Sequence, residues 1–234
     1  MDSKMILFDL DGTLLPMDNE LFIKTYFKSL AEKMMAYGYE PEKLIQSVWA
    51  GVKSMIVNDT EKTNEEVFWD CFCQFWGEDA RKDIGHFEEF YARDFVKVKA
   101  VCGFNELVPE MIAKLKEKGY RIALATNPIF PEIATQQRIH WSGLDPEDFE
   151  LFTTYENCTR CKPYLGYYAE VAKKLNVKPE DCLMVGNDVK EDLIAEKIGM
   201  KVFLLSDNVI NKEGADVSGY PQGGFKELME YLGV

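Results

Sequence analysis

Two aspartates with one residue between them, Asp9 and Asp11, stand out as residues that could do chemistry. They follow the apolar run 5–8, and alternation along a strand would direct both carboxylates to one face. Gly12 comes next and allows the backbone to turn away. Two carboxylates this close raise each other's proton affinity. A fold can stabilise the pair with a cation, for which hard oxygen ligands suit magnesium, or can use one carboxyl group to carry a proton.

Three later segments also place polar side chains at the ends of apolar runs or before a helical pattern. The apolar run that begins at Arg121 ends in a threonine and an asparagine, and Pro128 interrupts it. A lysine precedes Pro163 and a helical pattern. The run that begins at Cys182 ends in glycine and an acidic cluster. The polar residues at these positions are Thr126, Asn127, Lys162, Asn187, Asp188 and Asp192.

In this order, the four segments resemble the four motifs of the haloacid dehalogenase-like hydrolases. The phrase Phe-Asp-Leu-Asp-Gly-Thr-Leu at 8–14 resembles the first motif and is highly specific, whereas the second and third are weak alone. Many relatives place the fourth-motif acid directly after the glycine, where this chain has Asn187. Either Asp188 binds the metal, or Asn187 offers a neutral oxygen and Asp188 supports it. We favour Asp188, because a carboxylate is the better magnesium ligand.

The resemblance implies a magnesium-dependent phosphatase that hydrolyses a small-molecule phosphate monoester through an aspartyl-phosphate intermediate. Asp9 would attack phosphorus, and Asp11 would act as general acid and then as general base. Thr126 and Asn127 would bind phosphoryl oxygens. Lys162 would bind the phosphoryl group and neutralise the developing charge.

The same resemblance implies a set of residues around the cofactor Mg²⁺. Asp9, Asp11 and Asp188 would bind the ion, with the backbone carbonyl of Asp11 as one ligand. Asp192 and Asn187 would support this set, and Asp188 or Asp192 would orient the catalytic lysine.

The periodicity of the chain predicts where these residues are held. Residues 5–8 read as a strand. Four apolar stripes at helical spacing follow, over 21–35, 44–56, 67–76 and 84–95. From about residue 99 helices and strands alternate, which predicts a parallel sheet with helices on both faces. Ligands bind beyond the carboxyl ends of the strands in such sheets, where the polar residues described above are expected.

We therefore predict an α/β protein with a Rossmann-like, doubly wound parallel sheet and an inserted α-helical cap. Residues 1–15 and 99–234 would form the catalytic core, and residues 16–98 would form the cap. Thr63 and Glu66 read as a capping box at the start of the third cap helix. A short strand is expected near 149–153. Linkers near 14–17 and 99–103 would let the cap move over the site as a rigid body.

Four other functions remain open at this point. A phosphomutase is chemically close, because the intermediate would return its phosphoryl group to a sugar. A haloacid dehalogenase is disfavoured by Asp11, which such enzymes do not keep. A phosphonate-cleaving enzyme would need a cap lysine, and those of this chain read as solvated. A non-catalytic phosphate-binding module would be expected to lack a core carboxylate or the lysine, and all are present.

Composition restricts the class of protein and its partners. The net charge of −13 over 234 residues disfavours a nucleic-acid partner, whose phosphates would be repelled. No apolar run is long enough for a membrane span, and no signal-peptide pattern is present, so we expect a cytoplasmic enzyme that is a monomer or homodimer. Its partner would be a small phosphorylated metabolite. The six cysteines, including the Cys158–Cys161 pair, are expected to be free thiols.

Overall fold

A five-stranded parallel sheet forms the centre of the computed structural model, which describes residues 5–234; the first four residues of the predicted core segment 1–15 lie outside it. The strand order is β2-β1-β3-β4-β5. The strands are β1 (Met5–Phe8), β2 (Arg121–Leu124), β3 (Cys182–Gly186), β4 (Lys201–Leu205) and β5 (Gln222–Gly223). Phe8 is paired with Leu124 and Val185, so strands β2, β1 and β3 end side by side.

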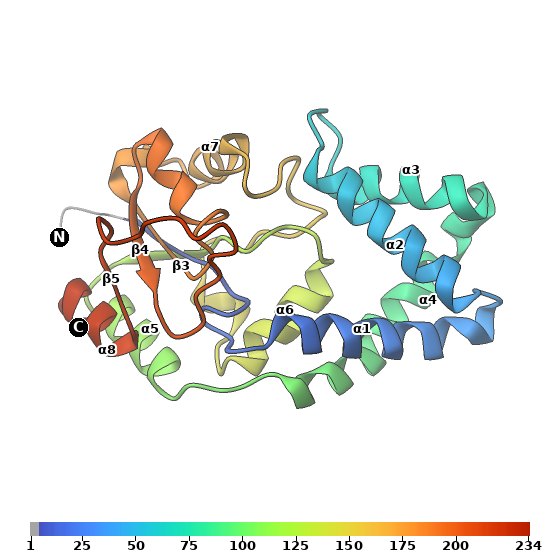
Figure 1. The fold of residues 1–234 in the computed structure, drawn as a ribbon, viewed down its shortest axis with the longest axis horizontal. Coiled ribbons are helices and arrows are strands. Elements are labelled where there is room, and N and C mark those ends of the chain that lie inside the picture. The colour runs from blue at the N-terminus through green and yellow to red at the C-terminus, as the bar shows by residue number, and fades with distance from the viewer. Residues whose placement is uncertain (1–4) are drawn as a thin grey trace.

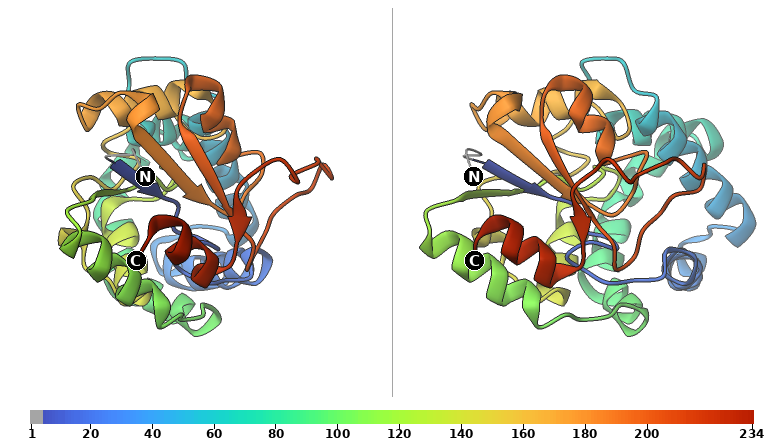
Figure 2. Two further views of the ribbon diagram at one scale, coloured as in Figure 1. Left: turned by 90° about the vertical axis from the view of Figure 1, so that its left-hand side faces the viewer. Right: turned by 60° about the vertical axis from the view of Figure 1, so that its left-hand side comes forward.

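Helices cover both faces of this sheet, because alternate residues of β1 point to opposite sides. Ile6 and Phe8 pack into one apolar cluster with α5 (Leu107–Glu117), α6 (Glu132–Trp141) and α8 (Phe225–Leu232). Met5 and Leu7 pack into the other with α7 (Leu165–Lys174) and the short 3₁₀ helix Leu193–Ile198. Figure 2 shows α5 and α8 together on one side of the strands and α7 on the other. The predicted doubly wound α/β architecture is confirmed.

The predicted elements differ from the structure in several places. The segment near 149–153 lies along β2 but is not a regular strand, since it pairs with β2 through a single isolated bridge between Phe152 and Leu124. The expected helix around 193–198 is a 3₁₀ helix. The sequence predicted no element at α6, β5 or α8.

The segment between β1 and α5 is helical, and Figure 1 shows it beside the sheet. Its helices are α1 (Asn19–Met34), α2 (Pro41–Ile56), α3 (Asn64–Trp76) and α4 (Ile84–Glu89). The predicted capping box is present, since Glu66 N–H donates to Thr63 and Thr63 N–H donates to Glu66. The fourth predicted stripe is irregular, because α4 continues into a π turn at Phe90–Asp94 and a 3₁₀ helix at Phe95–Val101. We call residues 16–98 the helical insertion.

The two connections of the helical insertion run side by side. Met17 and Cys102 form an antiparallel bridge, and Gly103 N–H donates to the Pro16 carbonyl at 2.7 Å. The insertion also contacts the core through Asn64, whose side chain donates to the Pro128 carbonyl at 3.2 Å. No helix within residues 5–234 is both long and apolar enough to cross a membrane.

Candidate active site

Asp9 lies directly after β1, at the carboxyl end of the sheet, and only 8 % of its surface is exposed. Its backbone N–H donates to the Val185 carbonyl at 2.9 Å, which continues the pairing of β1 with β3. Oδ1 accepts a hydrogen bond from Lys162 Nζ at 2.9 Å, and Oδ2 accepts one from Thr13 Oγ1 at 3.2 Å. The carboxylate is therefore held by a cation on one side and a hydroxyl group on the other.

Lys162 is buried and joins two carboxylates. Besides Asp9, its Nζ donates to Asp192 Oδ1 at 2.6 Å, and Asp192 Oδ2 accepts from the Asp188 N–H at 2.9 Å. Burial opposes the ammonium charge, but the charges of Asp192 and Asp9 outweigh it and raise the pKa of Lys162 well above its usual value. The lysine is thus a fixed cation beside Asp9.

The carboxylate of Asp11, unlike that of Asp9, faces helix α6. Oδ2 contacts Arg138 Nη1, while Oδ1 is buried and has no hydrogen-bond partner among the described residues. Arg138 is fully buried, donates to the Ala134 carbonyl, and stacks over the Phe130 ring at 4.4 Å from its centroid. Burial raises the pKa of Asp11, and the guanidinium opposes that shift.

Sequence reasoning missed Arg138. A signal was present, because Arg138 occupies the same helical face of α6 as the apolar Ala134 and Trp141. A basic residue at a buried position requires a partner. The sequence does not reveal that this partner is Asp11, which lies 127 residues earlier.

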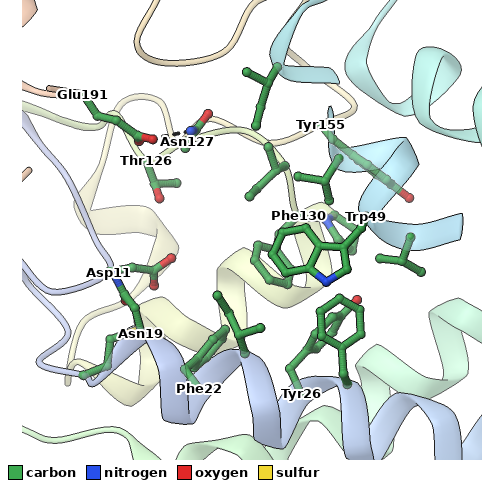
Figure 3. A pocket seen from close by; sticks show the side chains of 18 of the residues that line it. Asp11, Asn19, Phe22, Tyr26, Trp49, Thr126, Asn127, Phe130, Tyr155 and Glu191 are labelled. Atoms are coloured by element: carbon green, nitrogen blue, oxygen red, sulfur yellow. Dashed lines mark hydrogen bonds between the residues drawn. The ribbon is translucent and has the colours of Figure 1, made fainter. Parts of the chain in front are cut away.

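Thr126 and Asn127 follow β2 and line the same space as Asp9. Asn127 connects two parts of the site: its Oδ1 accepts from the Lys162 N–H at 3.3 Å, and its Nδ2 donates to Glu191 Oε2 at 3.1 Å. Burial raises the pKa of Glu191 to about 7. Figure 3 shows Thr126, Asn127 and Glu191 together at one end of the cavity, opposite the aromatic side chains.

Asn187 lies against the first motif more closely than Asp188 does. Its Oδ1 accepts from Thr13 Oγ1 at 2.9 Å, and a Cβ on Gly12 would come within 2.4 Å of its Nδ2. Because Gly12 also has a φ of +82°, any larger residue there would be strained and would displace Asn187. Asp188 instead turns its Oδ1 to the backbone N–H groups of Lys190 and Glu191, at 2.8 and 2.9 Å.

This geometry bears on the predicted metal ligands. Within residues 5–234, no three histidine, cysteine or acidic side chains lie close enough together to hold an ion. As three side chains, Asp9, Asp11 and Asp188 do not converge, because Asp11 faces Arg138 and Asp188 caps a turn. The Asp9 carboxylate, the Asn187 amide oxygen and the backbone carbonyl of Asp11 are nevertheless hard donors of the type that magnesium prefers.

A cavity of about 420 Å³ lies between the strand ends and the helical insertion. All the predicted site residues line this cavity except Lys162. Lys162 is buried and contacts Asp9 without lining the cavity itself. Side chains of α1, α2 and α3 form the opposite wall. The cysteines near the site, Cys158 and Cys161, are buried and unpaired.

Comparisons with known proteins show the family of this chain. A family model described as haloacid dehalogenase-like hydrolase matches residues 4–197. Pyrophosphatase PpaX of Bacillus mycoides (strain KBAB4) is 24 % identical over 207 residues, which cover 88 % of this chain and 85 % of that protein.

Solved structures share the fold at low sequence identity. A 2-haloacid dehalogenase from Pseudomonas syringae pv. tomato DC3000 has a TM-score of 0.64 at 17 % identity, covering 99 % of this chain and 98 % of that one. A predicted phosphoglycolate phosphatase from Haemophilus somnus 129PT has a TM-score of 0.58 at 19 % identity, covering 99 % of each chain. The hydrolase YfnB from Bacillus subtilis, described as bound to magnesium, has a TM-score of 0.57 at 15 % identity, covering 99 % of each chain. With the family model covering most of its length, this chain belongs to the haloacid dehalogenase-like hydrolases.

Proposed function

We propose that this chain is a magnesium-dependent phosphatase that hydrolyses a small-molecule phosphate monoester through an aspartyl-phosphate on Asp9. The observation that carries the proposal is the environment of Asp9. Its carboxylate lies at the end of a cavity, and the buried ammonium group of Lys162 lies 2.9 Å from it. An anionic nucleophile beside a preorganised cation is what attack on an anionic phosphoryl group requires.

In the proposed reaction, a carboxylate oxygen of Asp9 attacks phosphorus while the ester P–O bond breaks. The leaving oxygen takes a proton from Asp11, whose pKa is raised by burial as a general acid requires. A water molecule then attacks the phosphoryl group and gives a proton to Asp11. Phosphate leaves, and Asp9 is restored as a carboxylate.

Thr126, Asn127 and Lys162 would bind the phosphoryl oxygens. Magnesium would be held by Asp9, the backbone carbonyl of Asp11, and Asn187 or Asp188, and when bound it would reduce repulsion between Asp9 and the phosphoryl group. The hydrogen bond from Thr13 Oγ1 to Asn187 Oδ1 holds Asn187 against the first motif and favours it over Asp188. Asp192 would orient Lys162.

The helical insertion is proposed as a cap over a catalytic core formed by residues 1–15 and 99–234. Its two adjacent connections and its wall of the cavity support that role. Closure would exclude bulk water during transfer, and reopening would release phosphate. We also propose a small phosphorylated metabolite as partner, a monomeric or homodimeric state, and a cytoplasmic location.

The test measures release of inorganic phosphate from acetyl phosphate, with and without magnesium. We expect magnesium-dependent release that Asp9→Asn abolishes, and phosphate attached to the Asp9 peptide in quenched reactions. The exposed Asp79→Asn is the matched control and should keep full activity. Release that survives Asp9→Asn would refute the proposal, and transfer to an added sugar phosphate in place of water would indicate a phosphomutase.

A further inference from the structure

We propose that the organic group of the substrate is apolar and uncharged, so that the phosphoryl group is its only anionic part. This inference rests on the proposed phosphatase function and narrows its substrate class. The walls and charges of the cavity carry it.

The part of the cavity away from Asp9 is lined by aromatic and branched side chains from both the helical insertion and the core. Figure 3 shows aromatic side chains of this wall across the cavity from Thr126, Asn127 and Glu191. Its most prominent members are Phe22, Tyr26, Trp49, Trp69, Phe130 and Tyr155. A volume of about 420 Å³ lies in the range of pockets that hold small organic ligands. An apolar group bound there would remove both its own surface and these side chains from water.

Few cations in this cavity could pair with a second anionic group on the substrate. Among the described lining residues, Lys212 is the one with a positive charge, and it is exposed. It lies two residues after Ile210, which forms a bridge with Asp188, and therefore belongs to the phosphoryl end. The buried cations nearby are already paired, Lys162 with Asp9 and Asp192 and Arg138 with Asp11.

The lining acids make a second anion still less favourable. Five carboxyl groups face the cavity, and all belong to its catalytic end. A carboxylate or second phosphate on the organic group would have to enter the aromatic part without a counter-charge, and an unpaired buried charge is costly. The lining acids are Asp9, Asp11, Asp188, Glu191 and Asp192.

The polar groups of the aromatic wall are neutral. The hydroxyl groups of Tyr26 and Tyr91 lie 2.8 Å apart, and burial raises the pKa of Tyr91 to about 12. The buried indole N–H of Trp69 has no hydrogen-bond partner within the part of the chain described. Groups of this kind can accommodate a hydroxyl or ether oxygen on the substrate but cannot compensate a charge.

The experiment uses phosphates of primary alcohols, because their leaving groups are closely matched. Ethyl, butyl and 2-phenylethyl phosphate are compared with phosphoglycolate. We expect kcat/KM to rise about fourfold for each methylene that becomes buried. Phosphoglycolate should be the poorest substrate, at least about tenfold below butyl phosphate, because its carboxylate lacks a partner. Equal kcat/KM values across the three alkyl phosphates, or a higher kcat/KM for phosphoglycolate than for butyl phosphate, would overturn the inference.

Two variants of the protein test the same inference by changing the cavity and not the substrate. Ile23 and Leu21 both lie on α1 and are 38 % and 46 % exposed, but only Ile23 lines the cavity. Ile23→Arg should lower kcat/KM for 2-phenylethyl phosphate and raise it for phosphoglycolate, whereas Leu21→Arg should change neither. Equal effects of the two variants would count against the inference.

Acetyl phosphate separates this inference from the proposed function, because its acyl phosphate bond is activated and its hydrolysis needs little binding energy from the aromatic wall. If it is hydrolysed with dependence on Asp9 while the alkyl series is flat, the substrate class is wrong and the phosphatase stands. If acetyl phosphate is not hydrolysed either, the phosphatase proposal itself fails.

Discussion

The buried guanidinium group of Arg138 contacts the carboxylate of Asp11, which ties the proposed acid–base residue to helix α6. The contact fixes one oxygen of Asp11 and leaves the other without a partner among the residues described. Arg138 is itself held by the Ala134 carbonyl, by Thr135 and by the face of Phe130. The orientation of Asp11 is therefore set from outside the first motif.

Arg138→Met should destabilise the fold and slow the reaction. Removing one partner of a buried ion pair leaves the other charge uncompensated, and we expect a loss of about 2–4 kcal/mol in the free energy of unfolding. Urea denaturation measures this loss. The kcat for acetyl phosphate should fall as well, because Asp11 loses its fixed orientation.

A double-mutant cycle separates the pair from general packing. Asp11→Asn combined with Arg138→Met should lose less stability than the sum of the single variants, with a coupling of about 1–3 kcal/mol. Strictly additive losses would show that Arg138 acts through packing and not through Asp11.

Lys162→Met should separate stability from chemistry. It leaves Asp9 and Asp192 buried without their shared cation, so we expect both unfolding at lower urea concentration and a fall in kcat of about 10²–10³-fold. Adding Asp192→Asn removes one of the two charges and should recover part of the stability, but not the activity. Recovery of kcat in this double variant would remove Lys162 from the proposed charge-neutralising role.

Several site positions could be predicted from sequence because each follows an apolar run directly. Asp9, Thr126 and Asn187 come after β1, β2 and β3, and parallel strands that pair in register must end together. The environment of each side chain could not be predicted in this way. Asp11 and Asp188 both resemble metal ligands in sequence, yet one faces Arg138 and the other caps a turn, since contacts distant in sequence or local to the loop decide their orientation.

The helices also differ in how far the sequence predicts them. Helices with a continuous apolar stripe, such as α2, were predictable, whereas the apolar face of α6 is interrupted by the buried polar residues Thr135 and Arg138. The fourth stripe predicted one helix, but the backbone changes from α to π to 3₁₀ geometry between Ile84 and Val101. The aromatic residues of this segment are buried by tertiary packing, and sequence periodicity alone does not predict that packing.

Asn187→Ala tests which fourth-motif residue supports the metal. If Asn187 supplies the oxygen, the magnesium concentration for half-maximal activity should rise about tenfold or more in this variant. Asp188→Asn keeps an oxygen that can accept from Lys190 and Glu191, and should change that concentration much less. The opposite order would return the role to Asp188. Magnesium titrations of phosphate release measure both.

Glu191 should make the stability of the fold depend on pH. Burial raises its pKa from 4.5 to about 7, so the folded protein favours the protonated form. Its contribution is therefore fully present below about pH 4.5 and is lost as the pH rises through about 7, with roughly 3 kcal/mol as the upper bound for such a shift. Glu191→Gln cannot ionise, and its amide oxygen can still accept from Asn127.

Thermal unfolding of Glu191→Gln and of the unmodified protein should therefore give similar midpoints at pH 5, whereas at pH 8 the variant should be the more stable. Glu230→Gln on α8 is a matched control, because Glu230 is exposed and its substitution should shift the midpoint equally at both pH values. A midpoint difference for Glu191→Gln that does not grow between pH 5 and pH 8 would mean that the carboxyl group is ionised in the fold at little cost. In that case a group other than Asn127 must compensate the charge of Glu191. Lys162 is the candidate, because its positive charge already lowers the pKa of Glu191.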